Sequence, residues 1–259
     1  MENAENIHNQ LITGLKKYFK KAGFHRAVVG VSGGVDSSLT LKLAVDALGS
    51  ENITAISMPE VGVSAQENID HAKKLCEALK VTFFSQPINT LLKDFSQAPW
   101  SPNKLANQNT KARIRAVLLY NYANTAEALV LGTSNKSETL LGYGTKYGDL
   151  AADIEVIGDL YKDQVFALAD FVGLPREIIE KPPTAELYAG QTDENELGAS
   201  YAQLDPILKR LKLGEEALIE RGINPGLLQS VLKRIQKNKH KTMMPPIIKI
   251  KLPAKAGPY

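Results

Sequence analysis

The sequence predicts an α/β protein built on a parallel β-sheet. Short apolar runs of strand length alternate with longer segments in which apolar residues recur at helical spacing. A glycine-rich turn joins the first of these runs to the helix that follows it. Alternating strands and helices form βαβ units, whose sheet is parallel and whose ligands bind beyond the carboxyl ends of the strands. Strands are expected at residues 27–31, 53–58, 81–84 and 128–131.

Helices are expected before and between these strands. The chain opens with an amphipathic helix, because its apolar residues between positions 7 and 19 recur at helical spacing. Further helices are expected at 39–48, 65–79 and 111–126. The helix at 111–126 is apolar on most of its circumference, so it must be buried on two sides. We expect one side to face the core and the other to face a second copy of the chain in a homodimer.

Two polar stretches interrupt the alternation, and we expect them to form lids over a ligand. Residues 86–110 hold at most a short helix near 91–95, and residues 181–198 combine prolines with acidic residues. Loops this long in a compact domain are usually lids, binding loops or disordered segments. Later in the chain a helix is expected at 162–172, and another starts at Pro225 with Asn224 as its cap.

Length and composition favour one soluble cytoplasmic domain over residues 1–259. Hydrophobic content is 44% and charged content 23%, as in ordinary globular proteins. A net charge of +3 does not indicate a nucleic-acid partner. Cys76 is the only cysteine, which excludes an intrachain disulfide and a cysteine-rich zinc site, and its apolar neighbours predict burial. No apolar run reaches membrane-spanning length, and the N-terminus lacks the pattern of a secretory signal.

The glycine-rich turn at residues 30–38 is the strongest functional signal. Gly33 and Gly34 allow positive φ and close approach to a ligand. Ser37 and Ser38 can cap the helix start, where free N–H groups and the helix dipole favour an anion. The Asp36 carboxylate would repel phosphate unless a divalent cation lies between them. The turn therefore predicts a site for phosphate together with a metal ion.

Better-known phosphate loops have different patterns. A Walker A loop needs a Gly-Lys-Ser/Thr ending and the dinucleotide fingerprint needs Gly-x-Gly-x-x-Gly, and residues 30–38 contain neither. This segment resembles the Ser-Gly-Gly-x-Asp-Ser loop of the ATP pyrophosphatases, which cleave ATP to AMP and pyrophosphate. The resemblance implies a Rossmann-like three-layer αβα fold of the adenine nucleotide alpha hydrolase type.

Downstream motifs narrow the resemblance to one family. In order along the chain they are Lys111–Arg115, Thr133–Glu138, Gly144–Asp149, Ala152–Asp153, Gly158–Lys162, Pro182–Leu187, Gln191–Glu194 and Asn238–Lys241. Together with the first loop, this ordered set resembles NAD synthetase over nearly the whole chain. The resemblance implies that ATP activates the nicotinate carboxylate of deamido-NAD as a mixed anhydride with AMP, and that ammonia then displaces AMP. Such a reaction needs alignment and charge neutralisation and no side-chain nucleophile.

The resemblance also assigns roles to individual residues. ATP contacts are implied for Gly30, Val31, Ser32, Gly33, Gly34, Val35, Asp36, Ser37, Thr133, Lys162 and Thr184. Mg²⁺ ligation is implied for Asp36 and Glu138, and deamido-NAD contacts for Arg113, Lys146, Asp153, His240 and Lys241. Asp149 is our own hypothesis for the residue that binds and deprotonates ammonium. Three plainer alternatives remain: Glu138 as a first-turn helix charge, Lys162 as an exposed first-turn residue, and His240 as part of a basic tail.

Rival functions are distinguished by particular residues. GMP synthetase and argininosuccinate synthetase share the opening loop, but Pro183-Thr184 and His240-Lys241 argue against them. A non-catalytic nucleotide-binding module would have no use for Asp36 and Glu138 as a metal pair. Some NAD synthetases carry a glutaminase domain with a cysteine nucleophile, and the motifs here begin at Gly30 without room for one. Free ammonia is therefore the expected nitrogen donor.

Overall fold

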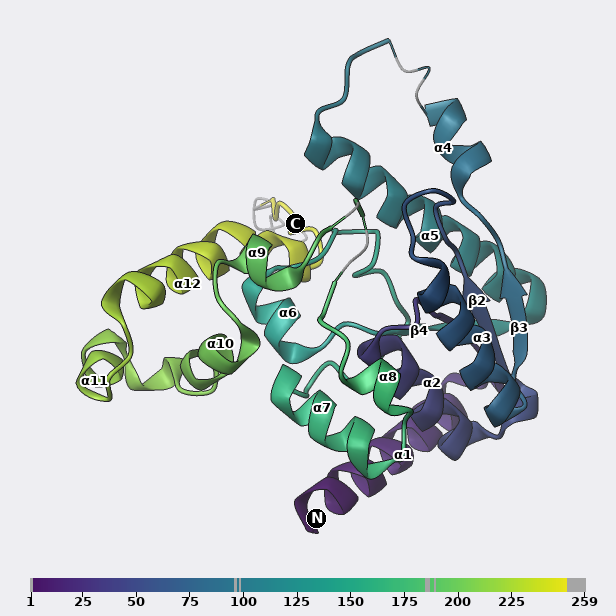
Figure 1. Cartoon of the computed structure of the whole chain (residues 1–259), viewed down its shortest axis with the longest axis horizontal. Coiled ribbons are helices and arrows are strands. Elements are labelled where there is room, and N and C mark those ends of the chain that lie inside the picture. The colour runs from purple at the N-terminus through teal and green to yellow at the C-terminus, as the bar shows by residue number, and fades with distance from the viewer. Residues whose placement is uncertain (1, 96, 98, 185–186, 189, 251–259) are drawn as a thin grey trace, which may run out of the picture.

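The computed structural model describes residues 2–95, 97, 99–184, 187–188 and 190–250, and within them a five-stranded parallel sheet lies between layers of helices (Figure 1). The strand order is β3-β2-β1-β4-β5, and every neighbouring pair is parallel. The strands are β1 (Arg26–Gly30), β2 (Ile53–Ser57), β3 (Thr82–Ser85), β4 (Ala128–Gly132) and β5 (Ile154–Glu155). The predicted α/β class is thus confirmed. The four predicted strands are correct to within one residue at each end, and β5, with two residues, is too short to show a pattern.

Helices cover both faces of the sheet, because the strand residues alternate between two apolar clusters. Val29 of β1 packs in the cluster that includes the first, second, third and seventh helices, whereas Val28 packs in the cluster of the fifth helix. On the first face lie α1 (Glu2–Ala22), α2 (Val35–Leu48), α3 (Gln66–Leu79), α7 (Lys162–Phe171) and the short α8 (Arg176–Ile179). On the second face lie α4 (Asn89–Phe95) and α5 (Lys104–Ala126). The three-layer arrangement agrees with the expected fold.

The α5 helix is longer than predicted, and one of its faces is exposed to solvent. It begins at Lys104, seven residues before the predicted start, because the Asn103 side chain caps it by accepting a hydrogen bond from the Ala106 N–H. The polar stretch before it is correspondingly shorter than expected. Ile114 is buried in the core, but Val117 is 68% exposed. Within one chain, therefore, the helix is not buried all round, and its outer face is available to a partner.

A second group of helices forms a lobe beside the sheet (Figure 1). It consists of α6 (Lys136–Leu141), α9 (Asp193–Leu197), α10 (Tyr201–Leu208), α11 (Glu215–Glu220) and α12 (Pro225–Asn238). The predicted start of α12 is confirmed, since the Asn224 side chain accepts a hydrogen bond from the Leu227 N–H. Helices α9, α10 and α11 were not predicted, because segments of five to eight residues are too short for a clear helical period. The predicted lid at 181–198 therefore ends in a helix, α9.

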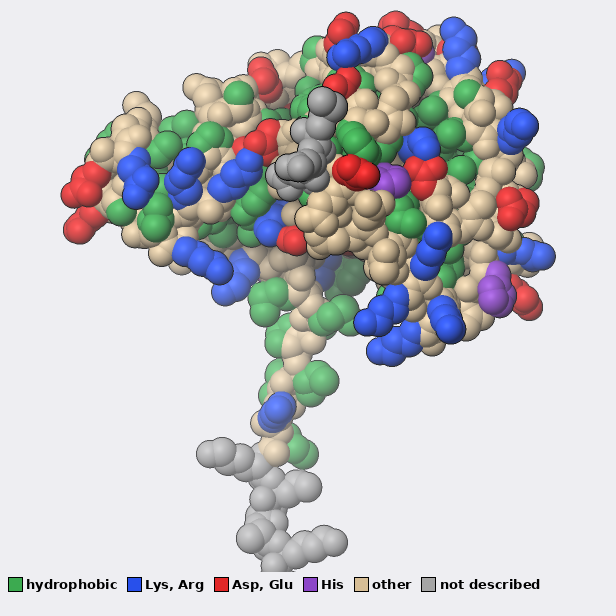
Figure 2. Space-filling view, turned by 90° about the horizontal axis from the view of Figure 1, so that it is seen from below, with side chains coloured by type: hydrophobic (Ala, Val, Ile, Leu, Met, Phe, Trp, Pro, Cys, Tyr) green, Lys and Arg blue, Asp and Glu red, His purple; other side chains and the backbone are tan. Residues whose placement is uncertain are grey.

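Short 3₁₀ segments complete the described chain: η1 (Ser50–Asn52), η2 (Leu211–Leu213) and η3 (Lys239–Thr242). After η3 the chain leaves the body as a narrow extension that carries exposed apolar side chains (Figure 2). Ile247 is 84% exposed and Ile248 is 91% exposed. Among the described residues, no helix is both long enough and apolar enough to cross a bilayer.

Candidate active site

Two adjoining cavities open at the carboxyl ends of the strands, where βαβ sheets bind ligands. The larger has a volume of about 820 Å³ and lies between β1, β2, β4, α5 and α12. The smaller has a volume of about 170 Å³ and lies over the glycine-rich turn and the start of α7. The residues that line both cavities are Ser32, Ser37, Thr133, Tyr143, Asp149 and Thr184. These shared residues mark the place where two ligands, one in each cavity, could meet.

The glycine-rich turn forms the floor of the smaller cavity. Gly33 has φ +81°, and a Cβ there would lie 2.2 Å from the Asn68 carbonyl oxygen, so only glycine fits. Gly34 has φ −86° and is itself the N-cap of α2, which corrects the expectation that both glycines adopt positive φ. Ser37 and Ser38 lie inside the helix rather than at its cap. The Ser37 Oγ instead accepts a hydrogen bond from the Ser32 N–H at 3.2 Å and so shapes the turn from within.

The structure brings the two predicted metal ligands together across the smaller cavity, and Lys162 lies between them. The Lys162 Nζ is 2.5 Å from Asp36 Oδ2 and 3.4 Å from Glu138 Oε1. Lys162 is only 1% exposed, which excludes the alternative that it is an exposed first-turn residue. Asn135 holds the remaining oxygens: its Nδ2 donates to Asp36 Oδ1 at 2.9 Å, and its backbone N–H donates to Glu138 Oε2 at 3.2 Å.

Burial dominates the electrostatics of this cluster. It raises the pKa of Glu138 to about 8; the Asp36 carboxylate adds to the rise, and the Lys162 ammonium opposes it. For Lys162, burial alone would lower the pKa, but the carboxylates of Asp36 and Glu138 outweigh burial and raise it. The two carboxyl groups therefore favour the charged ammonium form of the buried Lys162 side chain.

Asp193 is a third carboxyl group of the smaller cavity, and no role was predicted for it. Its side chain is 3% exposed and accepts hydrogen bonds from Tyr143 Oη at 3.1 Å and Tyr201 Oη at 3.0 Å. Burial raises the pKa of Asp193, and the Lys162 ammonium opposes that rise. The only signal in the sequence was its place in the Gln191–Glu194 motif. Its position depends on the fold of α9, which the sequence did not predict.

The donor set fits Mg²⁺ accompanied by phosphate. Mg²⁺ keeps several waters and is usually held by one or two carboxylates plus phosphate oxygens. Asp36 and Glu138 supply two carboxylates on the wall of a cavity that the glycine-rich turn also lines. No group of three or more His, Cys, Asp or Glu side chains in the described ranges could hold a metal by itself. The residues present are therefore suited to a metal that arrives with a phosphate ligand.

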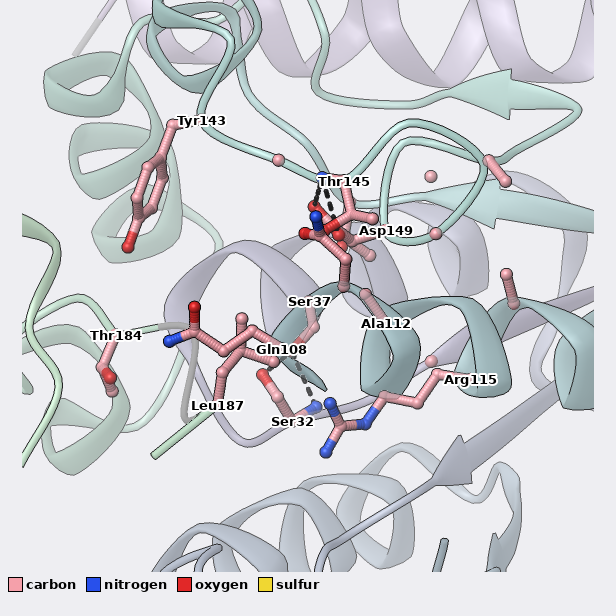
Figure 3. A pocket seen from close by; sticks show the side chains of 18 of the residues that line it. Ser32, Ser37, Gln108, Ala112, Arg115, Tyr143, Thr145, Asp149, Thr184 and Leu187 are labelled. Carbon is pink, nitrogen blue, oxygen red and sulfur yellow. Dashed lines mark hydrogen bonds between the residues drawn. The ribbon is translucent and has the colours of Figure 1, made fainter. Parts of the chain in front are cut away.

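Asp149 lies at the junction of the two cavities, in the turn after α6 (Figure 3). The Thr145 N–H donates to both carboxylate oxygens of Asp149, at 3.0 and 3.1 Å. Burial raises the pKa of Asp149, while the hydrogen bonds and the nearby Lys241 ammonium oppose the rise. The Lys241 Nζ itself donates to the carbonyl oxygens of Gly142 and Gly144, at 2.9 and 3.0 Å. The resulting buried carboxyl group is fixed in place and faces both ligand spaces.

Side chains from α5 and the 181–198 segment complete the larger cavity. Arg115 lines its wall (Figure 3), and the Arg115 Nε donates to the Met58 carbonyl oxygen at 2.9 Å. The motif at Lys111–Arg115 contains both Arg113 and Arg115, and the resemblance implied a role only for Arg113. Thr184 lines both cavities as expected, and its Oγ1 donates to the Gln191 carbonyl oxygen at 2.7 Å. Ala185 and Glu186 of that motif lie outside the described residues.

The remaining predicted ATP residues lie around the same edge. Gly30, Val31 and Thr133 line the larger cavity, and Val35 lines the smaller one. All the predicted ATP residues except Gly33 thus line one cavity or both, although they come from segments as far apart as residues 30 and 184. The geometry makes a joint role for these residues possible.

The five predicted deamido-NAD contacts are distributed differently. Lys241 lines the larger cavity, whereas Arg113, Lys146, Asp153 and His240 line neither cavity. Three of these four are in contact: the Arg113 Nε donates to the Lys146 carbonyl oxygen at 3.4 Å, and the Lys146 Nζ donates to the His240 carbonyl oxygen at 2.8 Å.

Asp153 lies apart from that cluster. Its carboxylate accepts hydrogen bonds from the Val130 N–H at 2.8 Å and Tyr120 Oη at 3.3 Å. Val130 belongs to β4 and Tyr120 belongs to α5. In the single chain, therefore, the Asp153 side chain braces the sheet against α5.

The sequence matches known proteins along nearly its whole length. The family model described as NAD synthase matches residues 7–245. The NH(3)-dependent NAD(+) synthetase of Wolinella succinogenes is 43% identical over 254 residues, which cover 97% of this chain and 98% of that protein.

Two solved structures have a similar fold. The NMN synthetase of Francisella tularensis has a TM-score of 0.86 at 28% identity, and the comparison covers 95% of this chain and 99% of that chain. The NH3-dependent NAD synthetase of Campylobacter jejuni, solved with a nitrate ion, has a TM-score of 0.82 at 35% identity with the same coverage.

Proposed function

The chain belongs to the NAD synthase family, and from this premise we propose that it is an ammonia-dependent NAD synthetase. In this reaction the nicotinate carboxylate of deamido-NAD attacks the α-phosphorus of ATP and releases pyrophosphate. Ammonia then attacks the activated carboxyl carbon, and AMP leaves as NAD forms. The family match also decides against the GMP synthetase, argininosuccinate synthetase and non-catalytic alternatives.

The observation that carries the proposal is the meeting of the two cavities at Asp149. The smaller cavity has the anion-binding turn and the cationic Lys162 that a departing pyrophosphate needs. The larger cavity, at about 820 Å³, is in the size range of nucleotide-sized ligands. A phosphoryl transfer that is mainly positioning and charge neutralisation needs this adjacency and no nucleophilic side chain.

On this proposal the phosphate side of the site works through fixed donors and charges. The turn at residues 30–37 holds the β- and γ-phosphates of ATP, with Gly33 allowing their close approach. Lys162 and Thr184 contact the same phosphates, and Thr133 contacts ATP at the junction of the cavities. Asp36 and Glu138 would hold Mg²⁺, which when bound neutralises part of the triphosphate's negative charge.

We propose that deamido-NAD extends from the larger cavity toward the outer side of α5. Lys241 would contact it from the cavity wall, and Arg113, Lys146, Asp153 and His240 from beyond that wall. An outward course supports a homodimer through α5, since Val117 leaves an apolar side chain 68% exposed on the same helix. A second copy would then cover this face and enclose the outer part of the dinucleotide.

We propose that Asp149 binds ammonium and accepts its proton. Its carboxylate lies where the acceptor carboxyl group and the phosphates of ATP would meet, and it is held by two hydrogen bonds from one N–H group. The chain is proposed to act as a single domain over 1–259, and free ammonia is its proposed nitrogen donor, in keeping with the name of the NH(3)-dependent relative of Wolinella succinogenes. An ATP-dependent reaction of this kind fits a cytoplasmic location.

A second acceptor is favoured by one comparison. The Francisella tularensis structure with a TM-score of 0.86 is titled NMN synthetase, which points to a mononucleotide product in that protein. The same chemistry on nicotinate mononucleotide would use the smaller cavity unchanged. The two functions differ only in whether the acceptor carries an adenylate half, and hence in what the outer residues Arg113, Lys146 and His240 contact.

The test is a reconstituted reaction with ATP, Mg²⁺, ammonium and either deamido-NAD or nicotinate mononucleotide. We expect NAD, AMP and pyrophosphate in equal amounts, and a higher kcat/KM for deamido-NAD. Production of ADP, or AMP release without an acceptor, would contradict the proposal. A higher kcat/KM for the mononucleotide would select the second function. Replacing ammonium with glutamine should abolish the reaction.

A further inference from the structure

We propose that Lys162 is a resident counter-ion that holds the place of Mg²⁺ in the nucleotide-free protein and leaves it when the metal arrives with a polyphosphate. The proposal rests on the proposed function only in taking a polyphosphate as the ligand of the smaller cavity. It concerns which cation lies between Asp36 and Glu138 before catalysis begins.

The first support is the set of oxygens that Lys162 occupies. Its Nζ lies 2.5 Å from Asp36 Oδ2 and 3.4 Å from Glu138 Oε1. The other oxygen of each carboxylate accepts a hydrogen bond from Asn135. The oxygens that face Lys162 are the ones that Asn135 does not bind, so they are the ones most open to a metal that both carboxylates ligate from within the cavity. The ammonium group and the metal ion compete for the same pair of ligands.

The second support is the concentration of acidic groups around a buried lysine. Asp36, Glu138 and Asp193 all line the smaller cavity, and all three interact electrostatically with Lys162. Without any cation, the burial and mutual repulsion of these groups would be uncompensated. Lys162 supplies the missing charge from a side chain that is 1% exposed. The nucleotide-free fold therefore has a use for this lysine that is separate from binding phosphate.

The third support is that the backbone of Lys162 is fixed, whereas its side chain is long and can rotate. The Lys162 backbone N–H donates to Ser137 Oγ at 3.0 Å, and that hydroxyl donates to Asp205 Oδ1 at 2.5 Å. Asp205 also accepts a hydrogen bond from the Asp163 N–H at 2.9 Å. The start of α7 is therefore held firmly, and the movement required is a rotation of the four-carbon side chain. A polyphosphate on the adjacent turn offers the displaced ammonium a new anionic partner.

The exchange predicts that Mg²⁺ alone binds the wild-type protein poorly. Mg²⁺ must displace an ammonium group that then has no polyphosphate to receive it, so binding becomes favourable only with a polyphosphate present. Lys162→Met removes the competing cation and keeps most of the side-chain volume. This variant should melt below the wild type without metal, because the carboxyl groups lose their counter-ion. It should also bind Mg²⁺ without nucleotide.

The experiment compares the wild type, Lys162→Met and Lys136→Met by thermal denaturation and calorimetry during Mg²⁺ titration without nucleotide. Lys136 is a matched control, since its Nζ also lies 2.5 Å from an aspartate oxygen, that of Asp159, but outside both cavities. We expect Lys162→Met to bind Mg²⁺ at least about tenfold more tightly than the other two proteins, with a saturable rise in melting temperature. Adding Asp36→Asn to Lys162→Met should remove that rise.

Two results would overturn the proposal: equal Mg²⁺ affinity in the wild type and Lys162→Met, or no metal-dependent stabilisation of the variant. If Lys162→Met does not fold, Lys162→Gln is tested in its place. The wild-type protein gives an independent test. If Mg²⁺ alone stabilises it as much as Mg²⁺ together with inorganic pyrophosphate does, the proposed exchange is refuted. None of these readouts measures NAD formation, so failure of the exchange and failure of the proposed function are distinguishable.

Discussion

The side chain of Asn135 joins two parts of the site that are 99 residues apart in the sequence: its Nδ2 donates to Asp36 Oδ1 at 2.9 Å. The same side chain caps α6, since Asn135 Oδ1 accepts from the Glu138 N–H at 3.0 Å. The Glu138 carboxylate in turn accepts from the Asn135 backbone N–H, which completes a capping box. One residue thus fixes both proposed metal ligands relative to each other.

Asn135→Ala should weaken both the fold and the binding of Mg²⁺-ATP. Loss of the cap is expected to cost about 0.5–2 kcal/mol of unfolding free energy. Loss of the Asp36 contact should also raise the KM for ATP. Asn224→Ala is the control, because Asn224 caps α12 in the same way, with a 3.0 Å hydrogen bond from Leu227, and lines neither cavity. Urea denaturation and steady-state kinetics should show a similar stability loss in both and a KM change only in Asn135→Ala.

Gly33→Ala should destabilise the protein, because alanine is strained at φ +81° and its Cβ would clash with the Asn68 carbonyl oxygen. The strain alone is expected to cost about 1–3 kcal/mol. Gly34→Ala is the matched control: its φ is −86°, and its Cβ would meet only Ser32 Oγ at 3.4 Å. The measurement is the urea midpoint of both variants. An equal effect at the two positions would mean that the turn is less constrained than its geometry indicates.

Asp149→Asn should lower kcat/KM for ammonium by about 100-fold or more, since the amide cannot accept a proton. The buried site retains its shape, because the Thr145 N–H still has one carbonyl oxygen to bind. Asp159→Asn provides the control, as this exposed aspartate pairs with Lys136 and lines neither cavity. Unchanged activity of Asp149→Asn at saturating ammonium across pH 7–9 would refute the role proposed for Asp149.

Val117→Glu should weaken self-association if α5 forms the dimer interface. A glutamate buried between two copies loses its hydration, so the dimer dissociation constant should rise at least about tenfold, or about 1.4 kcal/mol. Val61→Glu is a control of equal exposure, 66% against 68%, on the turn after β2. Sedimentation equilibrium compares the three proteins. A wild-type monomer at micromolar concentration, or an intact dimer of Val117→Glu, would exclude this interface.

Cys76 should make stability fall as the pH rises above about 8.5, the usual thiol pKa. Burial raises the pKa of its thiol to about 12 in the folded protein, with Glu77 adding to the rise. The unfolded chain therefore loses this proton at lower pH than the native one, which favours unfolding. Between pH 8 and pH 10 the loss is about 2 kcal/mol, and Cys76→Ala should lack it. Rapid labelling of the native thiol with a disulfide reagent at pH 8 would contradict this burial.

The α/β architecture could be predicted because its signals are local. The runs at 27–31 and 128–131 are apolar without alternation, which is typical of strands buried on both faces, and the structure places both in the centre of the sheet. The start of α5 was wrong by seven residues because residues 104–110 are mostly polar, and a single cap at Asn103 decides where the helix begins. Helix α9 has five residues and no visible period.

The candidate site could be predicted only as far as its motifs are local. The turn at 30–38 indicated a phosphate with a cation from its own residues, and the structure gives it a cavity. Asp193 carries no local signal beyond its place in the Gln191–Glu194 motif, since its position depends on hydrogen bonds with Tyr143, just after α6, and Tyr201 of α10. That Arg115 and not Arg113 lines the larger cavity depends on the orientation of α5 against the sheet, which no local pattern records.

By itself the sequence determined the chemical types of the parts: glycines in a tight turn, two carboxylates and a lysine. Only the tertiary structure decided which of these groups share a space. Asp36, Glu138 and Lys162 come from three separate helices, and their contact follows from how the helices pack on the sheet. Packing also made Lys162 a buried counter-ion rather than an exposed first-turn residue. The sequence gives the type of each side chain. Which side chains are buried, and which contact one another, depends on how distant segments pack together and exclude water.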